Sequence, residues 1–300
     1  INVPVGLVTI LIGEKFLPKD ITKTKEKIDF SGFACIAIAI MTFFGGIFLG
    51  QESGFGSLQS YLLFIIAIIA LGLFIMVERK RKSPLIKFAI FKNKIFTLSL
   101  LSAVLIFASN FFVNVVIPFY LQDARKLSAS YAGLLMMVFP LLMVVGAPLS
   151  GYLTDKIGPG ILTFGGLLLL CCTSLMYMFL DMNSPIWYYV IATAIMGLGN
   201  ALFQSPNNTM VMSSVEKQDL GVAGSMNSFA RNLGMVIGIA LSTTILYRGM
   251  SEAYGERVTT YLANRPDIFI VGMRETFFVA FLLCVAAFIL TILRFRKTTK

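Results

Sequence analysis

Eight long apolar runs dominate this chain, and each is long enough to cross a lipid bilayer as a helix. A spanning helix needs about 20 predominantly apolar residues. The runs are continuous and do not alternate in polarity, which excludes a transmembrane β-barrel. They cover residues 30–49, 61–77, 95–120, 131–153, 161–180, 187–204, 224–247 and 277–293, with an incomplete ninth run at residues 1–12. The sequence therefore predicts an all-α polytopic membrane protein with about nine transmembrane helices.

The distribution of Lys and Arg predicts the orientation of these helices. The net charge of +10 could by itself indicate a nucleic-acid ligand. If the runs cross the membrane alternately, however, 18 of the 25 basic residues lie on one side and six on the other. Basic residues accumulate in cytoplasmic loops. We therefore expect a multi-pass plasma-membrane protein with a cytoplasmic C-terminus, whose basic loops contact the lipid bilayer and not nucleic acid.

The residue types argue against an enzyme. The chain contains no histidine, so imidazole cannot serve as general base, zinc ligand or haem ligand. The four cysteines lie inside apolar runs, and we interpret them as small hydrophobic residues and not as a disulfide or metal set. Carboxylates are expected only in loops and at the ends of spans. We therefore expect no catalytic residue, no metal and no cofactor, and no proton-carrying step within this segment.

The connectors divide the spans unevenly. A basic connector, residues 78–94, follows the third run, and six runs with shorter cytoplasmic turns come after it. This pattern predicts the end of one unit followed by a complete six-helix unit. The chain also begins with Ile1 in the middle of an apolar run, without the basic start of a signal peptide. We expect it to be a fragment of a longer protein.

Arg231 is the charged residue that lies inside a predicted span. Asn227 precedes it by one turn, and Gly234 and Gly238 follow on a similar face. Arg231 could hold a charge network at the cytoplasmic end of a transport pathway, or it could reach past the helix end to the membrane surface. The two glycines form a G-x-x-x-G pair, for which close helix packing is favoured over a place in a pathway.

Two further helices carry paired amides one turn apart. Asn110 and Asn114 form one pair, and Asn200 and Gln204 form the other. Amides offer donors and acceptors without charge, which suits a cavity that must bind and release a solute. The alternative is hydrogen bonding that only joins helices. Because two helices share the pattern, we favour the cavity. Phenylalanines near these amides could attract a lipophilic cation, although packing is the more general role of such rings.

A compact motif, Gly151-x-Leu-x-Asp155-Lys156-x-Gly158, lies between two runs. Gly151 would allow close helix approach, and Gly158 would supply unusual backbone angles. Asp155 could cap the following helix or interact with the positive end of its dipole. Pro159 suits the first turn of the next helix. The spacing predicts a tight cytoplasmic turn.

This motif resembles the second-half copy of the cytoplasmic-loop signature of the major facilitator superfamily. The opening segment Ile1-Asn2-Val3-Pro4-Val5-Gly6-Leu7 resembles the sixth helix of its 14-span drug:proton antiporter branch, which includes multidrug and quaternary-ammonium exporters. The segment Ser205-Pro206-Asn207-Asn208-Thr209, followed by the Asn227 to Gly238 pattern, resembles late helices of the same branch. The basic residue that the family carries just after the glycine matching Gly158 is absent.

The resemblance implies a major facilitator helical bundle divided into three parts. Residues 1–16 would be the end of helix 6 of the N-terminal half, residues 17–94 two additional central helices with basic connectors, and residues 95–300 the C-terminal six-helix half. The implied function is proton-coupled efflux of drugs or other small amphipathic or cationic compounds by alternating access, as in antibiotic resistance, with protons carried by the absent N-terminal half. The alternatives are export of an endogenous lipid, peptide or metabolite, and a membrane structural subunit that transports nothing.

Overall fold

The computed structural model describes residues 2–16, 30–53, 57–81 and 88–298, and no strand occurs among them. Within these described ranges, eight helical segments are long and apolar enough to cross a membrane, and they correspond one by one to the eight complete runs of the sequence. The predicted all-α polytopic bundle is thus confirmed. The incomplete ninth run forms a helix of 15 residues, α1 (Asn2–Phe16). The basic residues predicted for 17–29 and 82–87 lie outside the described residues.

The helices begin and end at residues whose chemistry favours these boundaries. Asn93 starts α4 by accepting hydrogen bonds from the backbone of Ile95 and Phe96, and Ser57 and Ser128 cap α3 and α5 in the same way. Gly255 ends α9 in the left-handed conformation. The long helices are α2 (Phe30–Ser53), α3 (Leu58–Lys80), α4 (Lys94–Pro118), α6 (Val138–Ile157), α7 (Pro159–Met178), α8 (Ile186–Ser213), α9 (Leu220–Tyr254) and α10 (Pro266–Thr298), with α5 (Ala129–Met136) leading into α6.

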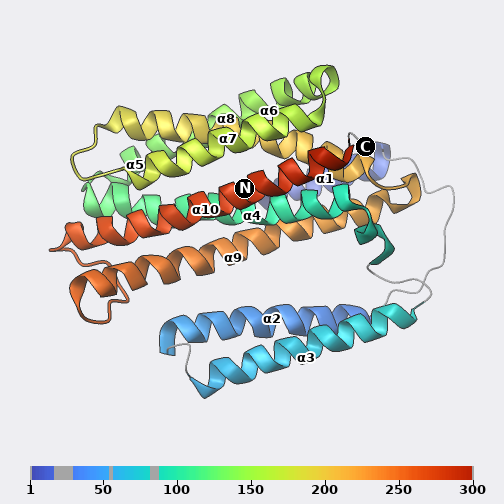
Figure 1. Ribbon diagram of the computed structural model, residues 1–300, viewed down its shortest axis with the longest axis horizontal. Coiled ribbons are helices and arrows are strands. Elements are labelled where there is room, and N and C mark those ends of the chain that lie inside the picture. The colour runs from blue at the N-terminus through green and yellow to red at the C-terminus, as the bar shows by residue number, and fades with distance from the viewer. Residues whose placement is uncertain (1, 17–29, 54–56, 82–87, 299–300) are drawn as a thin grey trace.

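Helices α4 to α10 form one packed body, with α4 and α10 running through its middle (Figure 1). Helix α4 contacts both α9 and α10, which also contact each other, while α7 joins α10 to α8, and α8 in turn packs against α6. More than half of the α4 span is buried, the largest share of any span. Its fully buried side chains include Phe112, Val116 and Ile117, which belong to the main hydrophobic core. Helix α4 is therefore the central, most deeply buried helix of the body.

Helices α2 and α3 pack mainly against each other, and in Figure 1 they lie beside α9 at the edge of the body. Large apolar side chains cover their outer surface, among them Ile68, Ile69 and Met41. In a protein that crosses a bilayer such a surface faces lipid, because lipid tails are as apolar as these side chains. The hairpin adds two spans with few contacts to the other six.

Helices α9 and α10 extend further than the apolar runs predict. The apolar runs end at residue 247 and resume at residue 277, but α9 continues to Tyr254 and α10 already starts at Pro266. The terminal turns of α9 and α10 are helical although many of their residues are polar, because the same turns also carry buried apolar side chains. Met250, Phe269 and Met273 are examples. The connection between the two helices is therefore only residues 255–265.

Candidate functional site

A cavity of about 470 Å³ opens between α4, α6, α8 and α9. Its volume is in the range of pockets that bind small organic molecules. Polar and aromatic side chains share its wall. The lining residues are Ala103, Phe107, Ala147, Ala201, Phe203, Gln204, Ser205, Asn207, Asn208, Gly224, Asn227, Ser228 and Arg231. The structure thus brings together three of the six predicted pathway residues, namely Gln204, Asn227 and Arg231.

Residues of α8 and α9 form the polar part of the cavity wall. Asn227 and Arg231 lie one turn apart on α9, and Asn227 donates a hydrogen bond from Nδ2 to Oδ1 of Asn208 on α8 at 2.7 Å. Arg231 Nη2 contacts Ser228 Oγ at 3.4 Å, and its guanidinium lies 6.0 Å from the centre of the Phe107 ring on α4. Because α9 starts at Leu220, Arg231 lies about three turns inside the helix and faces the cavity, not the helix end.

Asn110 and Asn200 lie deeper, and they bind each other. Asn110 Nδ2 donates to Asn200 Oδ1 at 2.6 Å, and Asn200 Nδ2 donates back to Asn110 Oδ1 at 3.1 Å. Both side chains are buried. Asn114, which is exposed, donates to the backbone oxygen of Asn110 at 3.1 Å. The placement of Asn110 and Asn200 outside the wall of the large cavity favours an interhelical bond between α4 and α8.

Beside this pair is a much smaller cavity, of about 10 Å³, whose wall includes Ser109, Ser174 and Cys284. That volume holds one water molecule at most. Ser109 Oγ also lies 3.2 Å from Cys284 Sγ on α10. These polar atoms satisfy one another within the body and leave no room for a solute.

Arg294 is a buried residue that the sequence did not single out. It directly follows the last apolar run, which ends at residue 293, but α10 continues to Thr298 and Arg294 is only 1% exposed. Its Nη1 donates to Ser99 Oγ at 2.8 Å and to Asn207 Oδ1 at 3.1 Å. Asn207 lines the cavity and Arg294 does not, so this arginine stabilises the cavity wall by holding the Asn207 side chain. In the sequence, the burial of Arg294 is indicated only by Phe295, an apolar residue that follows this arginine directly.

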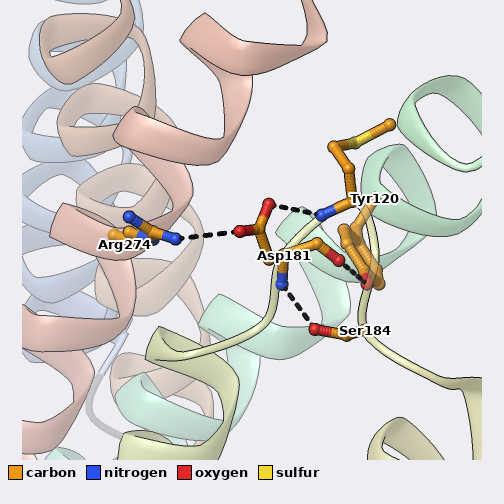
Figure 2. Close-up of polar contacts among 5 residues, drawn as sticks. Tyr120, Asp181, Ser184 and Arg274 are labelled. Atoms are coloured by element: carbon orange, nitrogen blue, oxygen red, sulfur yellow. Dashed lines mark hydrogen bonds and ion pairs between the residues drawn. The ribbon is translucent and has the colours of Figure 1, made fainter.

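The opposite end of α4 carries a second polar cluster that the sequence did not indicate. After Pro118, which lacks a backbone N–H, α4 continues as a π-helical turn, η2 (Phe119–Ala124). Tyr120 on this turn donates its hydroxyl to the backbone oxygen of Asp181 at 2.8 Å (Figure 2). Arg125 donates to Tyr120 Oη at 3.0 Å and to the Ser184 backbone oxygen at 2.6 Å.

Arg274 of α10 completes this cluster with an ion pair to Asp181 Oδ2 at 3.4 Å (Figure 2). Both side chains are about half exposed, so the pair itself adds little stability. The backbone hydrogen bonds of Tyr120 and Arg125 are the stronger connections. Together they fasten the loop between α7 and α8 to the end of α4.

The turn motif forms the tight junction between α6 and α7. Gly158 has φ 87° and ψ 150°, a conformation that requires glycine, and Pro159 starts α7. The expected cap by Asp155 was wrong. Helix α6 continues to Ile157, so Asp155 belongs to its last turn, and the first turn of α7 has no side-chain cap. Gly151 meets only Ser205, where an added Cβ would be 3.9 Å from Oγ.

Gly234 and Gly238 lie where α9 crosses α4. A Cβ atom at Gly234 would be 2.5 Å from the backbone oxygen of Val104 and 2.9 Å from the Cβ of Phe107. Gly238 faces the backbone of Ala108 equally closely. The two glycines therefore let the helix that carries Arg231 lie directly against the helix that carries Phe107.

Comparisons with known proteins identify relatives of this arrangement. The family model described as Major Facilitator Superfamily matches residues 30–239 and 100–300. The riboflavin transporter RibZ of Clostridioides difficile (strain 630) is 29% identical, over 100% of this chain and 63% of its own length. The uncharacterized transporter YebQ of Escherichia coli (strain K12) is 32% identical, over 82% of this chain and 54% of its own.

A third relative is named for drugs. The multidrug transporter protein MdtP of Bacillus subtilis (strain 168) is 27% identical, over 89% of this chain and 49% of its own length. The chain therefore spans about half to two thirds of the length of these relatives.

Proposed function

Because the chain belongs to the Major Facilitator Superfamily, we propose that it forms part of an exporter of small amphipathic compounds in the plasma membrane. The cavity between α4, α6, α8 and α9 carries this proposal. It combines aromatic surface with amides and a guanidinium, which can bind a solute of mixed polarity without holding it permanently. The similarity to a multidrug transporter supports a drug-like solute.

The proposed mechanism is alternating access within the 14-span drug:proton antiporter branch. In it the six-helix body formed by α4 to α10 would be one of two rocking halves, and α2 and α3 the additional central helices. The proposal places the proton-carrying carboxylates elsewhere in the whole protein, because none of the described Asp and Glu residues lines the cavity. The partners are thus the amphipathic solute, protons and the bilayer.

Export of one endogenous metabolite is the second candidate. The observation that favours it is the similarity to a riboflavin transporter over all of this chain. A cavity that serves one metabolite and a cavity that serves many drugs differ in how many solutes compete for it. The third possibility, a structural subunit, requires that the cavity bind nothing.

Cysteine labelling tests whether the cavity is a solute site. In a background whose native cysteines are all replaced by serine, we expect Gln204→Cys and Asn114→Cys in the whole protein to react with a water-soluble maleimide. Solute should slow the reaction of Gln204→Cys, because Gln204 lines the cavity. The control is Val144→Cys on α6, a lipid-facing apolar position that is 72% exposed, where we expect no reaction. If neither polar position reacts, the amides serve packing and the transport proposal fails.

A further inference from the structure

We propose that the cavity selects aromatic organic anions and disfavours lipophilic cations. This inference rests on the proposed function, because it assigns a substrate class to the same cavity. It differs from the expectation that the phenylalanines and amides of this segment receive cationic drugs. Three features of the wall carry it: one fixed positive charge, a set of hydrogen-bond donors, and an aromatic ring that already faces a cation.

The fixed charge is Arg231. Its guanidinium lines the cavity, and its one hydrogen-bond contact among the described residues is a long one, 3.4 Å, to Ser228 Oγ. No described Asp or Glu forms an ion pair with it, and none belongs to the wall. A guanidinium presents five N–H donors and does not deprotonate in proteins. The wall is therefore permanently positive, and most of its charged donors are available to a ligand.

Neutral donors reinforce this charge. The bond from Asn227 Nδ2 occupies Oδ1 of Asn208, so the oxygen of the Asn208 amide is used and its nitrogen has no protein partner in the described structure. Gln204 and Ser205 lie on the same stretch of α8 and also line the cavity. Amide nitrogens and hydroxyls can donate to a carboxylate or sulfonate oxygen. The arrangement suits a ligand that accepts several hydrogen bonds.

The aromatic surface does not favour a cation. Phe107 is the ring nearest to the fixed charge, and the Arg231 guanidinium lies 6.0 Å from its centre, at the limit of cation-π attraction. A second cation placed on this ring would approach a like charge in a partly desolvated site. The apolar edge of an aromatic anion, in contrast, can contact Phe107 while its acidic group reaches Arg231.

Two probes with the same aromatic ring test the inference. Pyrenebutyrate carries a carboxylate and pyrenebutyltrimethylammonium carries a quaternary ammonium, each joined to pyrene by a short alkyl linker. Binding of each is measured by fluorescence titration of the whole protein in neutral-lipid nanodiscs. We expect the anion to bind at least about tenfold more tightly than the cation, and we expect Arg231→Gln to remove most of this preference.

Arg248→Gln is the matched control, because it removes the same charge from the same helix at an exposed residue paired with Glu252, outside the cavity. It should keep the preference, as should Arg231→Lys, which also guards against a folding defect of Arg231→Gln. Tighter binding of the cation, or a preference that survives Arg231→Gln, would overturn the inference while leaving a solute site in place. If neither probe binds or protects Gln204→Cys, the cavity is no solute site and the proposed function fails as well.

Discussion

At the residue scale, the body is joined by polar side chains that bond across helices within its apolar interior. Asn110 and Asn200 exchange two hydrogen bonds, and Arg294 bonds to Ser99 and Asn207. A buried polar group without a partner is unfavourable, so each of these side chains depends on the others. These hydrogen bonds hold α4, α8 and α10 in fixed positions relative to one another beside the cavity.

The amide pair leads to a quantitative prediction. In a double-mutant cycle of Asn110→Ala and Asn200→Ala, we expect a coupling free energy of about 0.6–1.7 kcal/mol, the range for hydrogen bonds between membrane helices. The measurement is the free energy of unfolding of the whole protein in mixed micelles. A control cycle pairs Asn110→Ala with Asn207→Ala. Asn207 lies on α8, as Asn200 does, but it shares no hydrogen-bond partner with Asn110. Equal coupling in both cycles would contradict a direct bond.

At the element scale, close approach of α9 to α4 decides the shape of the cavity. The glycines at positions 234 and 238 remove the side chains that would separate the two helices. As a consequence Arg231, one turn before Gly234, lies against Phe107. Small residues are typical of such membrane-helix contacts because they let the backbones pack closely.

We expect Gly234→Ala to destabilise the protein by about 1–3 kcal/mol, because the added methyl group would overlap the α4 backbone. Gly221→Ala is the matched control on the same helix, where an added Cβ meets nothing within 4 Å. The control should be neutral or slightly stabilising, since alanine favours a helix more than glycine does. Thermal unfolding of the purified variants measures both effects. Equal melting temperatures for Gly234→Ala and Gly221→Ala would mean that α9 and α4 move apart without loss of stability.

The turn between α6 and α7 offers a second test at this scale. Gly158 has φ 87° and ψ 150°, whereas Gly255 at the end of α9 has φ 86° and ψ −3°. Asparagine is tolerated in the left-handed region of Gly255 but not in the region of Gly158. We therefore expect Gly158→Asn to destabilise the protein by about 1–3 kcal/mol and Gly255→Asn by much less. Unfolding of the two variants under identical conditions decides the matter, and a reversed order would refute the backbone argument.

At the scale of the whole molecule, the cavity and the Tyr120 cluster lie at different heights along α4. The cavity is lined by Ala103 and Phe107, near the middle of this helix, whereas Tyr120 lies on the turn that follows its end. The cavity adjoins the end at which α8 leaves the body and α9 enters it. The cluster fastens the loop between α7 and α8 at the other end.

The orientation of this body in the membrane remains a prediction from the charges. Lys217 and Arg265 are exposed and lie beyond opposite ends of α9. We expect a membrane-impermeant maleimide to label Arg265→Cys in intact cells and Lys217→Cys only after permeabilisation, because basic loops are retained in the cytoplasm. All native cysteines are again replaced. The opposite pattern would invert the molecule and place the C-terminus outside.

The sequence by itself determined the membrane class, the eight spans and the approximate bounds of each helix. These follow from local properties, since hydrocarbon excludes any backbone that does not satisfy its own hydrogen bonds. It also indicated three of the residues that line the cavity, because polar side chains inside apolar runs are rare enough to stand out. The reach of α9 and α10 beyond the apolar runs was missed, since their terminal turns are polar on one face.

Tertiary structure alone decided which polar residues meet. Asn200 and Gln204 lie one turn apart on α8, yet Asn200 bonds to Asn110 while Gln204 faces the cavity. Arg294 looked like one more cytoplasmic charge, but packing against α4 and α8 buries it behind the wall. The physical reason is that membrane insertion depends on each helix separately, whereas partners depend on how helices rotate and cross. The sequence indicated the charge of Arg231, but only that second level decides which residues share the cavity wall with it.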